Sequence, residues 1–187
     1  MLVEAAGVTL WDADVELRGV RRGMGMEYCK GSLYDGCGVP DDNPNLGGLY
    51  RRVDGTQPRW EQVWQWEFLT REDKDESEIL RGLTAISDPD DPNHELMLAT
   101  ATYPGVVYRI NPDAEQKATV ELNVREYFQK EWKADRPVRP CLSAYNRIVP
   151  YKVPDTGEKV HLIGVWVQHP DRDSTLGRSS WYLIRHS

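Results

Sequence analysis

The sequence is poor in the features that identify several classes of protein. Its 187 residues include only three cysteines, too few and too unevenly placed for a disulfide scaffold. No apolar run approaches the roughly 20 residues that a membrane-spanning helix needs, and the first residues lack the basic start and long apolar stretch of a signal peptide. Acidic residues outnumber basic ones by 30 to 23, and this charge disfavours phosphate backbones and anionic membranes. We therefore expect no nucleic-acid or membrane partner, and cytoplasmic is the default location.

Motifs for catalysis and for metal binding are also scarce. No serine lies in the glycine elbow of a hydrolase nucleophile, and no glycine-rich loop is followed by the helix and lysine of a phosphate site. His161 and His169 are too far apart along an extended strand to share a zinc ion. Cys29 and Cys37 flank a turn-rich segment where a hairpin would let them meet, but free thiols are favoured. The sequence identifies no catalytic residue and requires no cofactor.

A short phrase centred on a tyrosine recurs three times. It reads Gly-Leu-Tyr-Arg-Arg-Val-Asp at 48–54, Gly-Val-Val-Tyr-Arg-Ile-Asn-Pro-Asp at 105–113 and Trp-Tyr-Leu-Ile-Arg-His at 181–186. Each copy is a strand-like run, and a second such run follows the first two copies. The repeating unit is therefore expected to be a piece of β-sheet.

Turn-forming residues divide the middle of the chain into short strands. We expect these strands at 83–86, 95–101, 106–110 and 118–122, separated by turns rich in proline, glycine and acidic residues. Four short strands joined by tight turns form an antiparallel meander, the unit of a propeller blade. Further strands are expected at 26–33, 48–53, 59–66, 141–149, 160–167 and 181–185.

At one place the spacing of apolar residues changes from that of a strand to that of a helix. Asn123 is a suitable helix cap with Glu126 three residues later, and apolar residues on one face predict a helix over 124–133. The chain is thus expected to be a single all-β domain over 1–187, or a fragment of one. Its blade-like units are expected at about 26–68, 81–123 and 140–187. Because propellers close with four to eight blades, these units predict an incomplete ring, and a free-standing antiparallel β domain is the alternative.

Several segments carry a family resemblance. The runs 81–90, 96–100 and 105–113 resemble single blades of six-bladed propellers of the gluconolactonase, paraoxonase and strictosidine-synthase type. The run 47–51, followed by Asp54-Gly55 and Trp60, is similar to the repeats of sialidase-type propellers. Over residues 45–187 the chain is most similar to uncharacterised bacterial propeller proteins, although its motifs are generic for blades.

The resemblance to the lactonase-like propellers implies a calcium ion at one end of a central channel. One ligand of that ion immediately precedes the Gly-Leu of a first strand, and Arg81 stands at this position here, where a cation cannot bind metal. Asn146 and Glu27 are then the remaining candidate calcium ligands. The candidates for contacting an organic ligand are Arg81, Tyr145 and Asn146.

Two further groups of side chains have alternative interpretations. Arg51 and Arg109 follow the repeated tyrosine and either line a groove that binds a carboxylate or face outward from their strands. Strand alternation places Trp60, Trp64 and Trp66 on one face, either as a platform for a sugar or, as favoured, packed against an adjoining blade.

These observations favour a propeller-like protein that binds a small molecule, a glycan or a protein at the end of a channel. One alternative is a calcium-dependent hydrolase of the lactonase or arylesterase kind. Another is an assembly module in which unpaired strand edges associate between chains.

Overall fold

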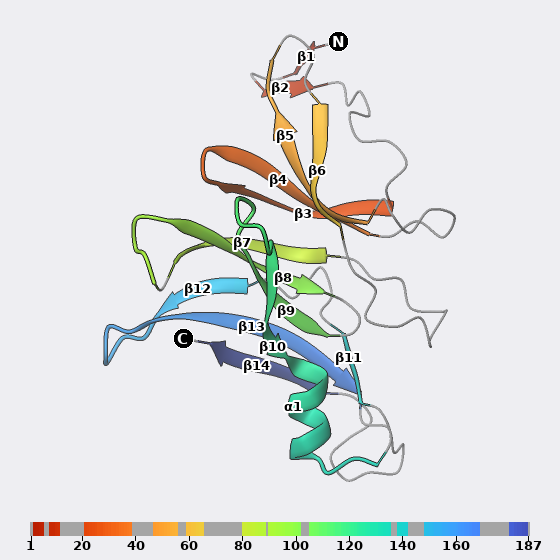
Figure 1. The fold of residues 1–187 in the computed structure, drawn as a ribbon, viewed down its shortest axis with the longest axis vertical. Helices are drawn as coiled ribbons and strands as arrows, with labels where there is room; N and C mark the ends of the chain where they lie inside the picture. Colours follow the sequence, from red (N-terminus) through yellow and green to blue (C-terminus); the bar gives the residue numbers. More distant parts are fainter. Residues whose placement is uncertain are drawn as a thin grey trace.

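Three antiparallel sheets stacked face to face make up most of the structure, which is a computed structural model (Figure 1). The residues that it describes are 2–5, 8–11, 21–38, 47–55, 59–65, 80–88, 90–101, 105–135, 138–141, 148–168 and 180–186. Among them the fold is all-β with one short helix, as the sequence predicts. In Figure 1 the first sheet lies at the top, the second in the middle and the third at the bottom.

The first sheet pairs its four strands in chain order. They are β3 (Arg21–Cys29), β4 (Ser32–Gly38), β5 (Gly48–Val53) and β6 (Arg59–Gln65). The prediction of one strand over 26–33 is wrong, because the chain reverses direction within it at Lys30 and Gly31. Both residues have positive φ, 48° and 74°, which is the geometry of a two-residue hairpin turn.

Near the N-terminus the strands β1 (Leu2–Ala5) and β2 (Val8–Trp11) form a separate two-stranded hairpin. The sequence did not indicate these strands.

The second sheet is the meander that the turn residues predict. It contains β7 (Leu80–Ser87), β8 (Glu95–Ala101), β9 (Val106–Ile110) and β10 (Ala118–Asn123), again paired in chain order. The helix α1 (Val124–Glu131) follows directly. As the capping pattern predicts, Asn123 Oδ1 accepts a hydrogen bond of 3.1 Å from the Glu126 amide.

The third sheet is built around the long central strand β13 (Lys159–Gln168). The strand β14 (Ser180–His186) pairs with one edge of β13, and β11 (Arg139–Cys141) and β12 (Ile148–Lys152) both pair with the other edge. A single strand was expected over 141–149. The described residues show instead two short strands in different registers, and the segment 142–147 between them lies outside the described residues.

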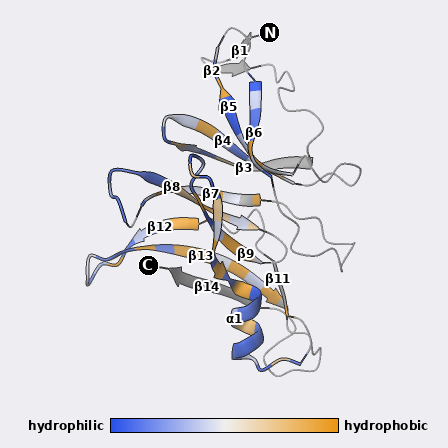
Figure 2. Cartoon of the chain, in the orientation of Figure 1, coloured by the Kyte–Doolittle hydropathy of each residue, from blue (hydrophilic) through white to orange (hydrophobic). Residues whose placement is uncertain are grey.

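Two hydrophobic clusters hold the stack together, one between each pair of neighbouring sheets. The second sheet contributes to both, because successive side chains of a strand point to opposite faces. On β8, Met97 and Ala99 join the cluster shared with the first sheet, and Leu98 joins the cluster shared with α1 and the third sheet. Accordingly, residues 96–101 of β8 are all buried. In Figure 2 the strands β9 and β12 carry hydrophobic residues, and the turns at the left of the view are hydrophilic.

The tyrosine phrase occupies the same place in all three sheets. Tyr50 pairs with Asp35, Tyr108 with Ala99 and Tyr182 with Val165. When β11 and β12, which share one edge of β13, are counted together as the first strand of the third sheet, each tyrosine is on the third strand, opposite the second. In the first two sheets the fourth strand also has one extra residue at the corresponding point. These extra residues are Val63 and Glu121, each a β-bulge next to the tyrosine pair. The repeat is thus one of register as well as of sequence.

Candidate functional site at the turn end of the first two sheets

The ligand-binding residues proposed from the sequence are not brought together among the described side chains. Tyr145 and Asn146 lie outside the described residues, and Arg81 is described only as backbone, at a register shift in β7. Glu27 is half-buried on β3, where its Oε1 accepts a hydrogen bond of 3.1 Å from the Tyr28 amide. Within the described part of the chain no three His, Cys, Asp or Glu side chains are grouped to hold a metal ion. The calcium site that pairs Glu27 with Asn146 stays a prediction.

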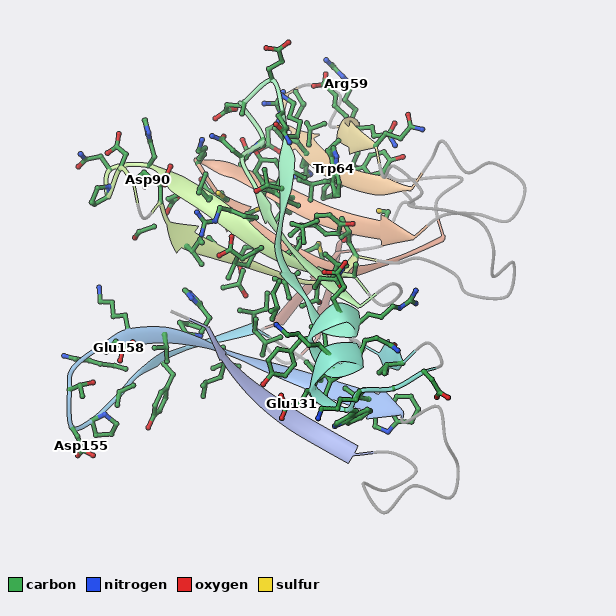
Figure 3. The ribbon with its side chains drawn as sticks, turned by 60° about the horizontal axis from the view of Figure 1, so that its bottom comes forward. Arg59, Trp64, Asp90, Glu131, Asp155 and Glu158 are labelled. Atoms are coloured by element: carbon green, nitrogen blue, oxygen red, sulfur yellow. The ribbon has the colours of Figure 1, made fainter. Side chains whose placement is uncertain are left out.

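One cleft lies where the turns of the first and second sheets meet. Its volume is about 440 Å³. We call it the Lys30 cleft, and it is lined by Lys30, Ser87, Pro92, Asn93, His94, Glu95 and Asp113. These residues come from the β3–β4 turn, from the loop between β7 and β8, and from the loop that follows β9. In Figure 3, Asp90 marks the β7–β8 loop, on the same side of the molecule as Asp155 and Glu158 of the β12–β13 turn.

Lys30, which lines the cleft, is held by three hydrogen bonds to the second sheet. Its backbone amide donates to Glu95 Oε2 at 2.7 Å, and its Nζ donates to Asn111 Oδ1 at 3.0 Å and to Asp113 Oδ2 at 2.9 Å. The hydrogen bond from Lys30 lowers the pKa of the Asp113 carboxyl below its ordinary value. A lysine at positive φ is uncommon, and these contacts offset the backbone strain of the turn.

The rim of the cleft is formed by the acidic loop between β7 and β8. Asp88 Oδ1 accepts from the Asp90 amide at 3.0 Å, and Asp91 Oδ1 accepts from the Asn93 amide at 3.1 Å. Such contacts are Asx turns, which shape a loop without a metal ion. These hydrogen bonds fit the turn that the proline and acidic residues of this segment predict. His94 Nδ1 lies 3.1 Å from Asp91 Oδ2 and is 65% exposed.

The chemistry available in the Lys30 cleft is hydrogen bonding. Glu95 and Asp113 supply acceptor oxygens, and Lys30, Asn93 and His94 supply donors. Ser87 and His94 both line the cleft, and in the described structure no hydrogen bond joins them. The sequence could not reveal this cleft, since its residues come from three turns between Lys30 and Asp113.

A second polar group is buried inside the first sheet. Asp35 is 8% exposed, Cys37 Sγ lies 3.8 Å from its Oδ2, and no described residue hydrogen-bonds its Oδ1. Burial raises the pKa of Asp35 to about 6 against an ordinary 3.8. In the repeat, Asp35 occupies the position that holds Ala99 and Val165 in the other sheets. A carboxyl thus stands where the other two copies have an apolar side chain.

The two cysteines of the first sheet are buried and free, which confirms the prediction of free thiols. Cys29 pairs with Ser32 next to the turn, and Cys37 pairs with Gly23 towards the other end of the hairpin. Burial raises the pKa of the Cys29 thiol to about 11 and that of Cys37 further. Neither thiol has the properties of a nucleophile.

The repeated arginines bind glutamates within their own sheets. Arg51 Nη2 lies 3.4 Å from Glu61 Oε2, and Arg109 Nη2 lies 2.7 Å from Glu121 Oε1. Of their two interpretations, these contacts favour strand residues that stabilise the sheet.

The expectation that Trp60 and Trp64 share a face is wrong, because the bulge at Val63 lies between them. Trp60 pairs with Arg52 and Trp64 with Leu49, and these two partners point to opposite faces of β5. Trp64 packs on Tyr108 of the second sheet, with ring centroids 5.4 Å apart, as the favoured packing role predicts. Trp66 lies outside the described residues.

Comparisons of this chain with protein-family models, with curated proteins and with solved structures find no match. Among the described residues, no helix has the length and apolar character needed to span a membrane.

Proposed function

We propose that this chain is a propeller-like binding protein whose ligand site is the Lys30 cleft. The blade interpretation is supported by the repeated register of the tyrosine phrase and by the bulge that recurs at Val63 and Glu121. The binding interpretation is supported by one observation above all. Three turns from two sheets converge on a cleft of about 440 Å³, in the size range of small-molecule sites.

The ligand class that fits this cleft is a hydroxyl-rich molecule such as a mono- or oligosaccharide. A sugar presents hydroxyls that donate and accept hydrogen bonds, and the cleft offers the carboxylates of Glu95 and Asp113 beside the donors Asn93 and His94. A phosphorylated or carboxylated ligand fits less well, because the Lys30 ammonium already binds Asp113 and the Glu95 carboxylate also lines the cleft. Binding without chemistry is favoured because, among the described residues, no hydrogen bond to His94 activates Ser87, which is the one hydroxyl side chain that lines the cleft.

Calorimetric titration of the full chain against a panel of neutral, amino and acidic saccharides tests this function. We expect saturable binding of a neutral or amino sugar, with affinity reduced at least about tenfold in Asn93→Ala and His94→Ala, where one polar contact is lost. Both side chains are exposed, so these variants should fold normally. Asp155→Asn in the β12–β13 turn is the matched control, since it changes an exposed loop carboxylate outside the cleft.

Absence of binding across the panel overturns the proposal, as does binding that the two cleft variants leave unchanged. Preference for an acidic sugar would contradict the assignment of the ligand class.

A further inference from the structure

The repeat gives each sheet two distinguishable faces. We call the face that carries Ala99 and Tyr108 in the second sheet the front face, and the face that carries Leu98 and Val107 the back face. Ala99 and Tyr108 belong to the cluster shared with the first sheet, and Leu98 and Val107 belong to the cluster shared with the third. Strand register identifies the same faces in the other two sheets. Asp35 in the first sheet and Val165 in the third occupy the position of Ala99, so each of them marks the front face of its own sheet.

Both internal interfaces are back-to-front. The first sheet presents its back face to the second, with Tyr34 and Leu49 in the shared cluster. The third sheet presents its front face to the second, with Ile163 and Val165 in the other cluster. The stack therefore ends in an outward front face on the first sheet and an outward back face on the third.

The outward front face exposes two large apolar side chains of β3. Met26 is 66% exposed and Tyr28 is 63% exposed. Register places Met26 at the position of Leu83 in the second sheet, which is 7% exposed against the first sheet. Tyr28 corresponds in the same way to Ile148 of the third sheet, which is 4% exposed. Ala85, the equivalent of Tyr28 in the second sheet, is partly buried against the same cluster as Leu83. The other half of this face, on β4 and β5, is buried at Asp35, Cys37 and Tyr50.

The outward back face exposes two large apolar side chains of β12. Val149 is 48% exposed and Tyr151 is 44% exposed. Register places Val149 at the position of Cys29 in the first sheet, which is fully buried against the second. Together with Met26 and Tyr28, these side chains are four of the six large hydrophobic residues exposed in the described part of the chain. Both patches lie on the first strand of a sheet, close to its first turn.

First strands also meet at both internal interfaces. β3 packs on β7 and β7 packs on β12. Thr84 Oγ1 of β7 donates a hydrogen bond of 3.1 Å to the Ile148 carbonyl of β12. At the other interface β3 also contacts the second strand, since Cys29 Sγ lies 3.8 Å from the Leu96 carbonyl of β8. A sheet that covered Val149 and Tyr151 in the same way would place its own first strand against β12.

We propose that a second copy of this chain docks head to tail, the β3 patch of Met26 and Tyr28 on one copy packing on the β12 patch of Val149 and Tyr151 on the other. A second copy is the occupant that the structure favours, because one chain carries both halves of the back-to-front contact. Such a contact is heterologous, so two copies can form it twice and close a ring of six sheets. This association uses sheet faces and does not depend on the ligand site.

Light scattering on the purified full chain tests the association. We expect a particle of twice the chain mass of 21.5 kDa. Tyr28→Glu and Val149→Glu should each give monomers, since a buried unpaired charge opposes either half of the contact. Val120→Glu is the matched control, because Val120 is 53% exposed on the edge strand β10, away from both patches.

A mixture of the two patch variants sharpens the test. In a mixed dimer one contact joins the two altered patches and the other joins two intact patches, so mixing the monomeric variants should restore dimers. Circular dichroism of each variant establishes that it is folded. A monomeric parent chain overturns the proposal, and so does a dimer that both patch variants retain. Dissociation by Val120→Glu alone would assign association to strand edges instead.

Discussion

The Nζ of Lys30 lies 2.9 Å from the Oδ2 of Asp113, and this contact ties the first turn of one sheet to the loop that follows β9 of the next. Asn111 Oδ1 accepts a second hydrogen bond from the same ammonium at 3.0 Å. Because Lys30 also occupies the left-handed region of backbone conformation, its side chain and its backbone act in opposite directions on stability.

Replacing Lys30 with methionine should lower the free energy of unfolding by about 1 kcal/mol, since two partly exposed polar contacts are lost and the strained turn stays. Lys30→Gly should be less destabilising, because glycine adopts positive φ without strain while keeping the amide that bonds Glu95. Urea unfolding of the two variants measures both effects. A glycine variant less stable than the methionine variant would contradict the assignment of strain.

The pH dependence of this contact follows from the lowered pKa of Asp113. A carboxyl with a lower pKa in the folded state stabilises the fold above its unfolded pKa, near 3.8, and loses that contribution as the pH falls through the folded value. The difference in stability between the parent chain and Lys30→Met should therefore be constant near neutral pH and shrink below about pH 4.

Asp35 is expected to have the opposite pH dependence. Its pKa of about 6 in the fold exceeds the ordinary 3.8, so the folded state binds more protons between these values and stability falls as the pH rises through them. Asp35→Asn should remove this dependence and stabilise the protein near pH 7 by up to about 3 kcal/mol. The gain should vanish below about pH 4, where both states are protonated.

Unfolding curves of Asp35→Asn and the parent chain, recorded from pH 4 to pH 8, measure this effect. The groups facing Asp35 on its own sheet are Cys37, Tyr50 and the amides of Gly25 and Gly36. A variant that is less stable than the parent chain at pH 7 would mean that ionised Asp35 is stabilised by its surroundings.

Gly36 should tolerate no side chain. A Cβ at this position would lie 2.7 Å from Leu80 Cβ and 3.1 Å from the Leu80 carbonyl oxygen, across the interface between the first two sheets. Gly36→Ala should therefore cost about 3 kcal/mol of folding free energy. Gly55→Ala is the control, since no atom lies within 4 Å of a Cβ there, and it should change stability by less than about 0.5 kcal/mol.

Leu80→Ala should not rescue Gly36→Ala, because the closest contact is with the Cβ that alanine retains. Thermal unfolding of the three variants measures this, and rescue in the double variant would show that the sheets can shift relative to one another.

Much of the second sheet could be predicted from the sequence because its determinants are local. Proline, glycine and acidic turn residues bound every strand of the segment 80–123, and β9 has the limits 106–110 that the turns imply. The helix was predictable for the same reason, since Asn123 and its bond to the Glu126 amide lie within one turn. The strand over 26–33 was wrong because Gly31 is preceded by a lysine, and lysine rarely occupies positive φ.

Features that depend on pairing between strands could not be predicted in this way. The bulge at Val63 reverses the alternation that the sequence shows, and it separates Trp60 from Trp64. Likewise, the Lys30 cleft depends on the stacking of two sheets, and nothing local to Lys30 indicates Asn111 or Asp113. The burial of Asp35 becomes interpretable only through its alignment with Ala99, which requires the register of both sheets.

The two repeated arginines should differ in how much they stabilise their sheets. The Arg109–Glu121 contact is 2.7 Å long, with the side chains only 29% and 15% exposed. The Arg51–Glu61 contact is 3.4 Å long and more open, and Glu61 also binds Arg59 at 2.7 Å. Glu121→Gln should therefore lower the free energy of unfolding by about 2 kcal/mol, because it leaves a poorly solvated guanidinium without its full countercharge. Glu61→Gln should cost much less.

A double-mutant cycle measures the interaction energy between Arg109 and Glu121 separately from their contacts with the rest of the sheet. Arg109→Met combined with Glu121→Gln should recover part of the loss caused by Glu121→Gln alone, since removing both charges leaves no uncompensated ion in the sheet. Urea unfolding of the two single variants and the double variant measures the coupling. Purely additive losses of stability would mean that Arg109 and Glu121 stabilise the sheet independently. Equal losses for Glu61→Gln and Glu121→Gln would mean that burial does not set the strength of the repeated ion pair.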